Sequence, residues 1–364
     1  MKKVLIISND NLGLGGIQSV IMSIVRGLRH ECIFDIVVFN HDYCEYEEEF
    51  ERQGDIFTIP QKTGKRTIRK RLDFYIRPFN LYRQIKQVIR KHGPYDIIHC
   101  HNYFEEAIAL KVAAEENIPI RIAHCHSYMA IPPKKILRRA YNHIYRRMIL
   151  KYSTCTIACS SIAGKYLYGD NNGTVVVANA INSNEFSYVS GKGINPWSFL
   201  HVGRWGGPKN QLFLLDVFYC ICKQHKDSML TLVGYGDANE LQRIKEKIQS
   251  LKLTGRVTIL PGDSSISNLM HTNNVFIFPS IFEGLGMVLI EAQATGMKCF
   301  ASSKVPREAD LGLVDFLDLN SGAQEWSDYI CNYIRNSGTK RVKVELGDYD
   351  IDNNIKTYKS IYNV

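Results

Sequence analysis

The stretch NVFIFPSIFEGLGMVLIEAQATG, residues 274–296, decides the fold class because it contains a buried strand, a glycine-rich turn and a helix in direct succession. Residues 275–278 are apolar and β-branched or aromatic, which is typical of a parallel strand buried on both faces, and Pro279 ends the run. Residues 287–295 have helical composition, and Gly296 suits the C-cap. Such a unit is the repeat of an open α/β sheet, in which ligands bind at the carboxyl ends of the strands.

Two carboxylates flank this turn, eight residues apart at Glu283 and Glu291. Glu283 is predicted on the loop and Glu291 in the helix, about 7 Å further along its axis. The amides of Gly284, Leu285 and Gly286 would point out of the helix N-terminus, which suits a phosphate, whereas the carboxylates suit sugar hydroxyls. The pattern favours a nucleotide sugar as ligand. The alternative, a solvated loop Glu and a helix-surface Glu, remains open because the spacing alone is a weak signal.

The same alternation of strands and helices extends over the whole chain. The 364 residues are too many for one usual core, so two domains of about 180 residues are expected. The polar segment 187–196 is the predicted linker. Strands are predicted at 4–7, 33–39, 97–99, 121–125 and 175–177 in the first half and at 198–202, 229–233, 257–260 and 275–278 in the second, with helices at 16–28, 80–91 and 210–222.

Composition indicates a globular intracellular protein. The chain is 45% hydrophobic, yet it has no run of about 20 apolar residues, and its start, MKKVLIISND, is too short and too soon polar for a signal peptide. The expected location is the cytoplasm. The ten cysteines are scattered without paired spacing, which is typical of reduced core thiols.

Five segments in order resemble the family 4 retaining glycosyltransferases, which have the GT-B fold. EGLGMVLIEAQATG at 283–296 resembles their E-x7-E signature, and HVGRWGGPKNQLFLLDVF at 201–218 resembles their glycine-arginine and lysine-asparagine segment. The other three are GLGGIQ at 13–18, LVGYGD at 232–237 and RVTILPGD at 256–263. The resemblance is closest to bacterial enzymes of exopolysaccharide or capsule biosynthesis.

The resemblance implies an α/β protein of two Rossmann-like domains that face each other across a cleft. Residues 1–186 would form the acceptor domain and residues 187–347 the nucleotide-sugar donor domain. Residues 348–364 would form a helix that crosses back to the first domain.

The resemblance also implies a function. The enzyme would transfer a hexose or an N-acetylhexosamine from a UDP-sugar to a glycan or lipid-linked glycan with retention, by front-face displacement. The UDP-sugar would be a substrate, and no cofactor or metal is expected. A covalent nucleophile role for Glu283 is disfavoured. The alternative function is a non-catalytic nucleotide- or glycan-binding protein of the same fold.

The family pattern assigns the site residue by residue. Catalytic or diphosphate-binding roles fall to His126, Glu283, Arg204 and Lys209, and donor-binding roles to Gly15, Gly16, Gly203, Gly234, Pro261, Gly284, Leu285, Gly286 and Glu291. Arg204 and Lys209 would bind the diphosphate, in charge-assisted bonds of about 1.5–3 kcal/mol each. Glu283 would hold the transferred sugar and Glu291 the ribose. Without the resemblance, a lone Arg and Lys in a loop are more often a solvated pair. Pro208 is predicted at the first position of the following helix.

The glycines after the first strand are not a dinucleotide fingerprint. The pattern G-x-G-x-x-G that begins at Gly13 requires glycine where the chain has Gln18. An NAD-dependent dehydrogenase is therefore disfavoured. A tight turn at Gly15 and Gly16 remains, either as a plain strand-to-helix turn or as one whose amides approach a phosphate or the acceptor.

Histidines occur in two His-Cys-His triplets at the ends of predicted strands. Because residues i and i+2 of a strand face the same way, His99 with His101, and His124 with His126, could each reach one metal ion. A metal site is nevertheless not expected. The resemblance places His126 beside the donor sugar, and His124 is expected to be structural.

Positive charge is concentrated in the first half of the chain, although the total is only +9. Residues 62–91 contain eleven Lys or Arg and one acid, and residues 134–151 contain seven and none, both interleaved with apolar side chains. The pattern favours peripheral binding to an anionic membrane, at the inner face of the cytoplasmic membrane. A solvated basic face remains the alternative, and no nucleic-acid-binding motif is present.

Overall fold

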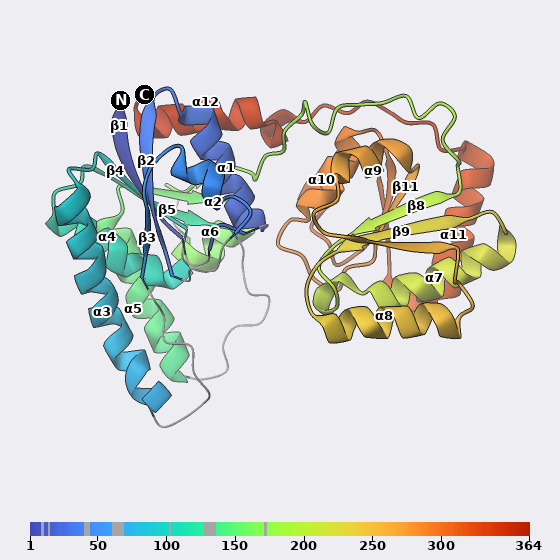
Figure 1. Ribbon diagram of the computed structural model, residues 1–364, viewed down its shortest axis with the longest axis horizontal. Helices are drawn as coiled ribbons and strands as arrows, with labels where there is room; N and C mark the ends of the chain where they lie inside the picture. Colours follow the sequence, from blue (N-terminus) through green and yellow to red (C-terminus); the bar gives the residue numbers. More distant parts are fainter. Residues whose placement is uncertain are drawn as a thin grey trace. The chain divides into compact units, whose positions relative to one another are not determined.

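The computed structural model describes residues 1–8, 11–13, 15–39, 44–59, 69–101, 103–126, 136–170 and 173–364, and of residues 69–77, 103 and 137 only the backbone. The chain folds as two compact units, Met1–Ala180 with Ile351–Val364, and Ile181–Asp350. Each unit is a parallel sheet with helices on both faces (Figure 1). The expected α/β fold of two Rossmann-like domains is confirmed.

The first unit is built on a seven-stranded sheet in the order β3-β2-β1-β4-β5-β6-β7. Its strands are β1 (Lys2–Ile7), β2 (Cys32–Val38), β3 (Ile56–Thr58), β4 (Ile97–Cys100), β5 (Ile120–Cys125), β6 (Cys155–Ala158) and β7 (Val175–Val176). The central strands form because their apolar side chains are buried on both faces, as in β1, whose residues 4–7 are at most 1% exposed. The strand order changes direction between β1 and β4, which makes this edge the topological switch point of the sheet.

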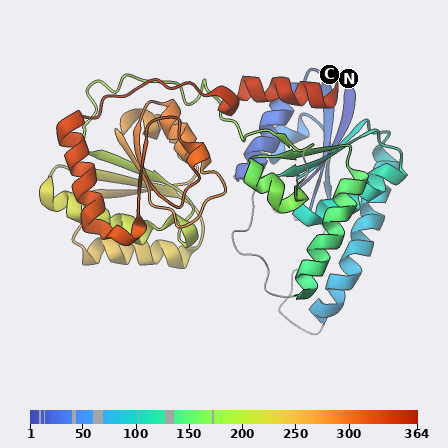
Figure 2. The same ribbon diagram turned by 180° about the vertical axis from the view of Figure 1, so that it is seen from behind.

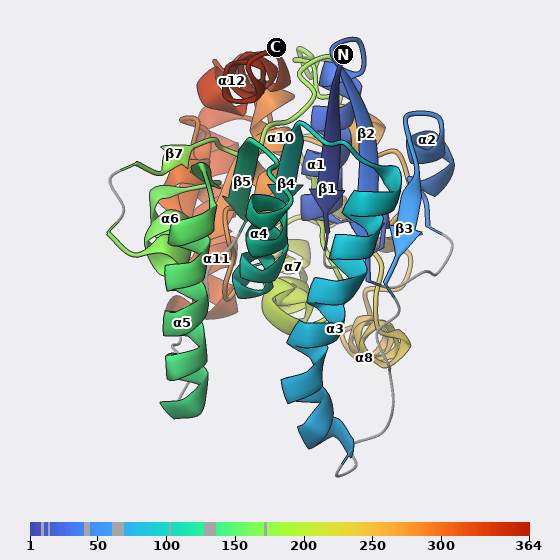
Figure 3. The same cartoon turned by 90° about the vertical axis from the view of Figure 1, so that its left-hand side faces the viewer.

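Helices cover both faces of the first sheet. They are α1 (Gly16–Leu28), α2 (Glu47–Glu51), α3 (Arg69–His92), α4 (Glu106–Glu115), α5 (Ile136–Tyr152), α6 (Ser161–Tyr168) and α12 (Ile351–Tyr362). Helices α3, α4 and α5 lie side by side on one face (Figure 3). On the opposite face α12 packs against α1, so the end of the chain belongs to the first unit (Figure 2).

The second unit is built on a six-stranded sheet in the order β10-β9-β8-β11-β12-β13. Its strands are β8 (Ser198–Val202), β9 (Met229–Gly234), β10 (Val257–Pro261), β11 (Val275–Phe278), β12 (Lys298–Ser302) and β13 (Val314–Leu317). Helices α7 (Gln211–Gln224), α8 (Ala238–Ser250) and α11 (Gly322–Ser337) cover one face. Helices α9 (Ile266–Thr272) and α10 (Met287–Ala294) cover the other (Figure 1). The switch point lies between β8 and β11.

Short 3-10 turns link some of these elements. They are η1 (Tyr103–Glu105), η2 (Gly207–Lys209), η3 (Arg307–Ala309), η4 (Leu319–Ser321) and η5 (Gly347–Tyr349). Among the residues described, no helix combines the length and the apolar composition that crossing a membrane requires.

The unit boundaries differ slightly from the predicted ones. The first unit ends at Ala180 rather than at residue 186, and the chain returns to it at Ile351 rather than at residue 348. The reason is local pairing. Ile181 and Asp350 form an isolated parallel bridge, and the amide of Ile181 donates to the carbonyl of Tyr349. Both connecting segments are therefore already paired within the second unit at these residues.

Candidate functional site

The predicted donor residues gather at the switch point of the second sheet. Arg204 and Lys209 follow β8, and Glu283 follows the neighbouring strand β11. Two hydrogen bonds tie the loops together: the amide of Ile281 donates to the carbonyl of Pro208 at 2.7 Å, and the Asn210 side chain donates to that of Pro279 at 3.1 Å. These bonds hold residues 69 and 73 positions apart in sequence together at one edge of the sheet.

Lys209 and Glu283 form an ion pair at this edge. The ammonium Nζ of Lys209 donates to Oε1 of Glu283 at 2.7 Å, and both side chains are largely buried, at 19% and 11% exposure. The same ammonium lies 4.6 Å from the ring centroid of Phe278, which limits its access to water. The pair therefore presents a cation and a carboxylate together, the two groups that a diphosphate and a sugar hydroxyl need.

Arg204 is exposed, unlike Lys209. Its guanidinium lies 6.0 Å from the ring centroid of Tyr235, and its carbonyl accepts a hydrogen bond from the Gln211 side chain at 2.9 Å. Pro208 does lie in the first turn of a helix, but that helix is the short η2 and not α7, which begins only at Gln211. The chain turns between them because Asn210 adopts a left-handed conformation, with φ of 60°.

Glu291 lies in α10 and is only partly exposed. Burial raises its pKa to about 7; the nearby Glu185 adds to the increase, and Lys209 opposes it. A carboxyl group whose pKa is shifted strongly toward 7 is typical of functional sites. The turn before it leads into α10 through Gly286, whose φ of +91° favours glycine. Within this turn Leu285 is buried at 5% exposure, and Gly284 lies between it and Glu283.

The remaining donor-side residues lie at the ends of β9 and β10. Gly234 ends β9 and Pro261 ends β10, next to each other in the sheet. A Cβ at position 234 would lie 2.3 Å from the carbonyl oxygen of Gly203, so only glycine permits this approach of two strand ends. The amide of Gly203 in turn donates to the carbonyl of Val233 at 2.9 Å. These residues shape the backbone of the edge rather than provide functional groups.

Gly15 and Gly16 lie at the switch point of the other sheet. Gly15 is the N-cap of α1 and Gly16 is its first residue. The side chain of Gln18 donates to the carbonyl of Asn11 at 3.2 Å, so the residue that breaks the dinucleotide pattern helps close the turn. A Cβ at Gly16 would meet nothing within 4 Å. The part of this loop that includes residue 14 lies outside the described residues.

Four histidines form a buried cluster at the same switch point, at the ends of β4 and β5. This histidine cluster comprises His99, His101, His124 and His126, none more than 8% exposed. His99 Nε2 and His124 Nδ1 lie 3.2 Å apart, and His101 Nδ1 and His126 Nε2 lie 2.6 Å apart. The two pairs lie against each other with their rings tilted by 34°, and the ring centroids are 4.2 Å apart between His99 and His101 and 4.0 Å apart between His124 and His126. The hydroxyl of Tyr362 in α12 adds a bond to His99 Nδ1 at 2.8 Å.

Burial keeps these imidazoles neutral. Loss of solvation lowers the pKa of His99 to about 3 and that of His126 to about 4, and it lowers the pKa values of His101 and His124 well below the usual range. The neighbouring rings add to the effect at His99, His101 and His124, whereas at His126 a hydrogen bond with Asn179 opposes it. His126 would therefore act as a neutral donor or acceptor.

The cluster is also the strongest candidate metal centre among the described residues. His99, His101 and His124 each offer a nitrogen within 4.8 Å of the others. Both nitrogens of His99 already make hydrogen bonds, to Tyr362 and to His124, so a metal bound to His99 would have to displace one of these two bonds. The absence of a metal thus stays a prediction.

Sequence reasoning located His126 but not its partners. His124 was expected to be structural, His101 was considered only together with His99 as a metal ligand, and no pattern indicated Asn179. The i, i+2 spacing of the His-Cys-His triplets was the available signal, since it places each pair on one face of a strand. The cysteines between them, Cys100 and Cys125, pack on the opposite face as that alternation requires.

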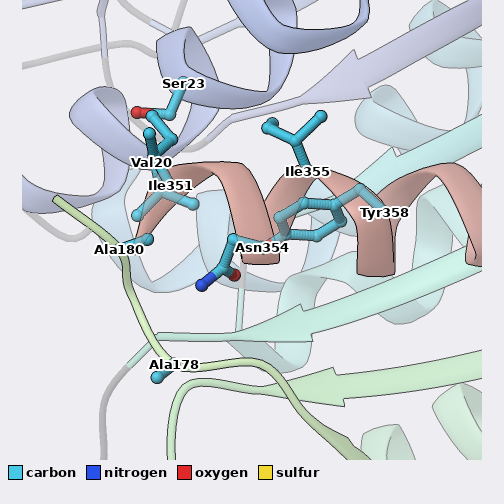
Figure 4. Close-up of a pocket in the computed structure, with 8 residues that line it drawn as sticks. All are labelled: Val20, Ser23, Ala178, Ala180, Ile351, Asn354, Ile355 and Tyr358. Carbon is cyan, nitrogen blue, oxygen red and sulfur yellow. The ribbon is translucent and has the colours of Figure 1, made fainter. Parts of the chain in front are cut away.

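A separate small pocket lies between α1 and α12 in the first unit (Figure 4). Its lining is mainly apolar and comprises Val20, Ser23, Ala178, Ala180, Ile351, Asn354, Ile355 and Tyr358. None of the predicted site residues belongs to it.

Comparison with known proteins identifies the family. The model described as Glycosyltransferase Family 4 matches residues 14–185, and the one described as Glycosyl transferases group 1 matches residues 183–311. The putative glycosyltransferase EpsF of Bacillus subtilis (strain 168) is 27% identical over 98% of this chain and 95% of its own. The UDP-Gal:alpha-D-GlcNAc-diphosphoundecaprenol alpha-1,3-galactosyltransferase of Escherichia coli is 26% identical over 75% and 80%.

The fold comparison agrees. The crystal structure of HepE from Anabaena in complex with UDP and glucose superposes with a TM-score of 0.75 at 16% identity, and covers 100% of both chains. Since the identity is low, this likeness establishes the fold alone. The chain belongs to glycosyltransferase family 4 and has the GT-B fold.

Proposed function

We propose that this protein is a retaining glycosyltransferase that moves a hexose or an N-acetylhexosamine from a UDP-sugar to a lipid-linked glycan in bacterial exopolysaccharide or capsule biosynthesis. The observation that carries the proposal is the gathering of Arg204, Lys209, Glu283 and Glu291 at the switch point of the second sheet. The relative from Escherichia coli, whose name specifies a UDP-sugar and a diphosphoundecaprenol acceptor, supports the choice of both substrates.

Each donor residue has a chemical task in this proposal. Arg204 and Lys209 bind the diphosphate and stabilise the negative charge that develops on UDP as it leaves. Glu283 accepts hydrogen bonds from hydroxyls of the transferred sugar, and Glu291 accepts them from the ribose. The two cations supply the positive charge that a divalent metal provides in other transferases, so we propose that neither a metal nor a cofactor takes part.

The reaction proceeds by front-face displacement. The acceptor oxygen bonds to the anomeric carbon while the bond from that carbon to the UDP oxygen breaks on the same side. The hydroxyl proton moves to the departing phosphate oxygen. We propose that His126 hydrogen-bonds a hydroxyl of the sugar and that the amides of Gly15 and Gly16 approach a phosphate or the acceptor.

The acceptor is proposed to be reached at the inner face of the cytoplasmic membrane. The exposed face of α5 mixes apolar and cationic side chains, because Ile136, Arg139, Ile144, Arg147 and Lys151 recur at helical spacing and are all exposed. Ile136 and Ile144 are 81% and 55% exposed. Such a face binds an anionic membrane, at about 1 kcal/mol per engaged cation.

The other predicted basic segment, residues 62–91, gives less support to membrane binding. Lys86 and Arg90 of α3 form ion pairs with Glu116, which neutralises part of its charge. Residues 62–68, 134 and 135 lie outside the described residues.

Co-flotation with vesicles at low salt tests the proposed membrane binding. We expect the protein to bind phosphatidylglycerol vesicles and not phosphatidylcholine vesicles, and the double substitution Arg139→Glu with Arg147→Glu should abolish the binding. Equal binding to both vesicle types would contradict an electrostatic surface.

Transfer itself is tested with the full-length protein, labelled UDP-glucose, UDP-galactose and UDP-N-acetylglucosamine, and an undecaprenyl-diphosphate-linked sugar. We expect one donor to yield a product with an α-anomeric proton by NMR, at an unchanged rate after EDTA treatment. Lys226→Ala, an exposed change outside the site, is the control. UDP binding without transfer from any donor would favour the non-catalytic binding protein.

A further inference from the structure

Arg138 lies on the inward side of α5, although its side chain is exposed. An α-helix turns by about 100° per residue, so Arg138 shares a side of α5 with Tyr145 and Ile149, two and three turns later. Tyr145 is partly buried against the core of the first unit, and Ile149 is completely buried. Ile136 and Arg147, which are proposed to lie at the membrane, are on the opposite side of the helix.

The first turns of α5 extend beyond the carboxyl end of the first sheet (Figure 3). The hydroxyl of Tyr141 donates to Oε1 of Glu105 at 3.4 Å, and Glu105 ends η1, the short turn after β4. Because α5 runs back along the sheet toward the start of β6, Arg138, one turn before Tyr141, lies still further beyond the end of β4. The neighbouring strand β5 ends one residue before His126. Arg138 is therefore at the edge of the sheet that contains the predicted acceptor-side residues.

Two stacked tyrosines support the guanidinium of Arg138. The rings of Tyr141 and Tyr145 have centroids 4.1 Å apart and an interplanar angle of 24°. The central carbon of the guanidinium lies 5.0 Å from the ring centroid of Tyr141. A guanidinium held against an aromatic ring keeps the N–H groups at its edge available, and these can bind two oxygens of one phosphate group at once.

Arg138 has no ionic partner within the part of the chain that the structure describes. No carboxylate there lies within ion-pair distance of its guanidinium, Glu105 included. Another arginine of α5, Arg146, instead donates to the backbone carbonyls of Leu167 at 2.9 Å and Tyr166 at 2.6 Å, so its task is structural. An oriented guanidinium without such a task is suited to an anionic ligand.

We propose that Arg138 binds the diphosphate of the lipid-linked acceptor and that the stack of Tyr141 and Tyr145 orients it. The inference rests on the proposed function, in which a diphosphate joins the lipid of the acceptor to its glycan. The outward side of α5 would lie at the membrane, where the lipid is. The opposite side of the same turns would receive the diphosphate, and the glycan would extend from there toward the ends of β4 and β5.

A phospholipid headgroup is the competing source of phosphate. An arginine that binds headgroups belongs on the outward side of α5, with Arg139 and Arg147, whereas Arg138 is on the inward side. Arg138→Met should therefore float with phosphatidylglycerol vesicles as the wild type does. Loss of flotation in this variant would assign Arg138 to the membrane surface and contradict the proposal.

Calorimetric titration of the full-length protein with farnesyl diphosphate tests the site directly. This short, soluble analogue has the diphosphate and part of the lipid but no sugar. Farnesol, which lacks the diphosphate, is titrated in parallel, and an excess of UDP keeps farnesyl diphosphate out of the proposed donor site. We expect the wild type to bind farnesyl diphosphate about tenfold or more tightly than farnesol. Equal affinity for the two would overturn the proposal.

Three variants assign that binding to one residue. Arg138→Met should weaken farnesyl diphosphate binding about tenfold or more, and Arg138→Lys, which keeps the charge but loses the planar fork, about threefold. The matched control is Arg335→Met, an exposed arginine on α11, which should bind as the wild type does. Unchanged binding in Arg138→Met, or an equal loss in Arg335→Met, would contradict the assignment. Thermal unfolding confirms that each variant is folded.

Transfer kinetics separate a contact with the acceptor from a structural role. Two acceptors have the same sugar, one linked to farnesyl diphosphate and one to octanol. We expect Arg138→Met to raise KM about tenfold for the diphosphate-linked acceptor alone, with kcat and KM for the UDP-sugar within about threefold of the wild type. Equal effects on both acceptors would contradict the proposal. If neither acceptor is used, the proposed function fails, whereas the farnesyl diphosphate titration still tests Arg138.

Discussion

Nζ of Lys209 donates to Oε1 of Glu283 at 2.7 Å, across 74 residues of sequence and between the loops that follow two neighbouring strands. The two groups have opposite tasks in the proposed reaction, one toward the diphosphate and one toward the sugar. A diphosphate would compete with Glu283 for the ammonium of Lys209. Substitution of Lys209 and substitution of Glu283 should therefore have different effects on donor binding and on transfer.

Substitution of each partner should separate donor binding from transfer. Lys209→Met removes a charge-assisted bond to phosphate and should weaken UDP binding about tenfold or more. Glu283→Gln removes the charge of the partner and weakens its bond to Lys209, and it should leave UDP affinity within about threefold while lowering kcat about 100-fold. Calorimetry and initial rates measure the two effects. Equal weakening of UDP binding by both variants would contradict the division of tasks.

The raised pKa of Glu291 predicts a pH dependence of stability. Because its pKa is about 7 in the folded protein and 4.5 in the reference state, the folded form holds the proton more tightly. Stability contributed by the protonated form is therefore present below pH 4.5 and is lost as the pH rises toward 7. Glu291→Gln removes this loss and should raise the free energy of unfolding above pH 7. The gain is on the order of 2 kcal/mol after allowance for the partial exposure of the side chain.

Thermal unfolding at two pH values measures this effect. Glu291→Gln should unfold at a higher temperature than the wild type at pH 8 and at nearly the same temperature at pH 5. An equal increase at both values would show that the gain does not arise from ionisation of Glu291.

Arg341 is predicted to stabilise the second unit through hydrogen bonds to backbone carbonyls. Its guanidinium is 1% exposed and donates to the carbonyls of Thr295 at 3.0 Å, Met270 at 2.5 Å and Asn273. These carbonyls lie at the C-terminal ends of α9 and α10, where the helix dipoles favour a cation. Burial opposes the charge and lowers the pKa of Arg341 to about 10.

Arg341→Met should therefore destabilise the protein by about 3 kcal/mol, because buried carbonyls lose their donor. Urea unfolding of the full chain provides the measurement. The control is Arg335→Met, since Arg335 is exposed on α11 and its bonds are solvent-accessible. A similar small loss in both variants would contradict the assigned role of Arg341.

Gly16→Ala tests whether a ligand approaches the start of α1. The added methyl group meets nothing within 4 Å, and alanine favours the helix by about 0.5–1 kcal/mol, so stability should be unchanged or slightly higher. Transfer should nevertheless fall about tenfold if a ligand contacts this amide. Ser19→Ala, exposed one turn later, should leave the rate unchanged. Full activity of Gly16→Ala would remove Gly16 from the site.

Those parts of the fold that depend on local pattern were predictable from sequence. The helix at 16–28 and the strands at 198–202 and 275–278 have the predicted bounds, because apolar runs end at glycine, proline or polar residues. Helix α3 begins at Arg69 rather than at residue 80, and it includes Pro78, a residue that ordinarily ends or kinks a helix.

Contacts between distant segments were not predictable in the same way. The bond between His99 and Tyr362 joins residues 263 positions apart, and it depends on the packing of α12 against the first unit. The resemblance to a family located Lys209 and Glu283, but no sequence pattern shows that they bind each other. Periodicity identifies which face is buried, whereas the partner of a buried polar group depends on tertiary structure.

The central claim, that the switch point of the second sheet binds a uridine nucleotide donor, is tested most directly by calorimetric titration of UDP. The titration compares the wild type with Arg204→Ala, Glu291→Ala and the exposed control Lys226→Ala, and GDP is measured in parallel. The account predicts micromolar UDP binding that Arg204→Ala and Glu291→Ala each weaken about tenfold, or about 1.4 kcal/mol, and that Lys226→Ala leaves unchanged. Failure of the wild type to bind UDP, or binding that neither site variant weakens, would contradict it.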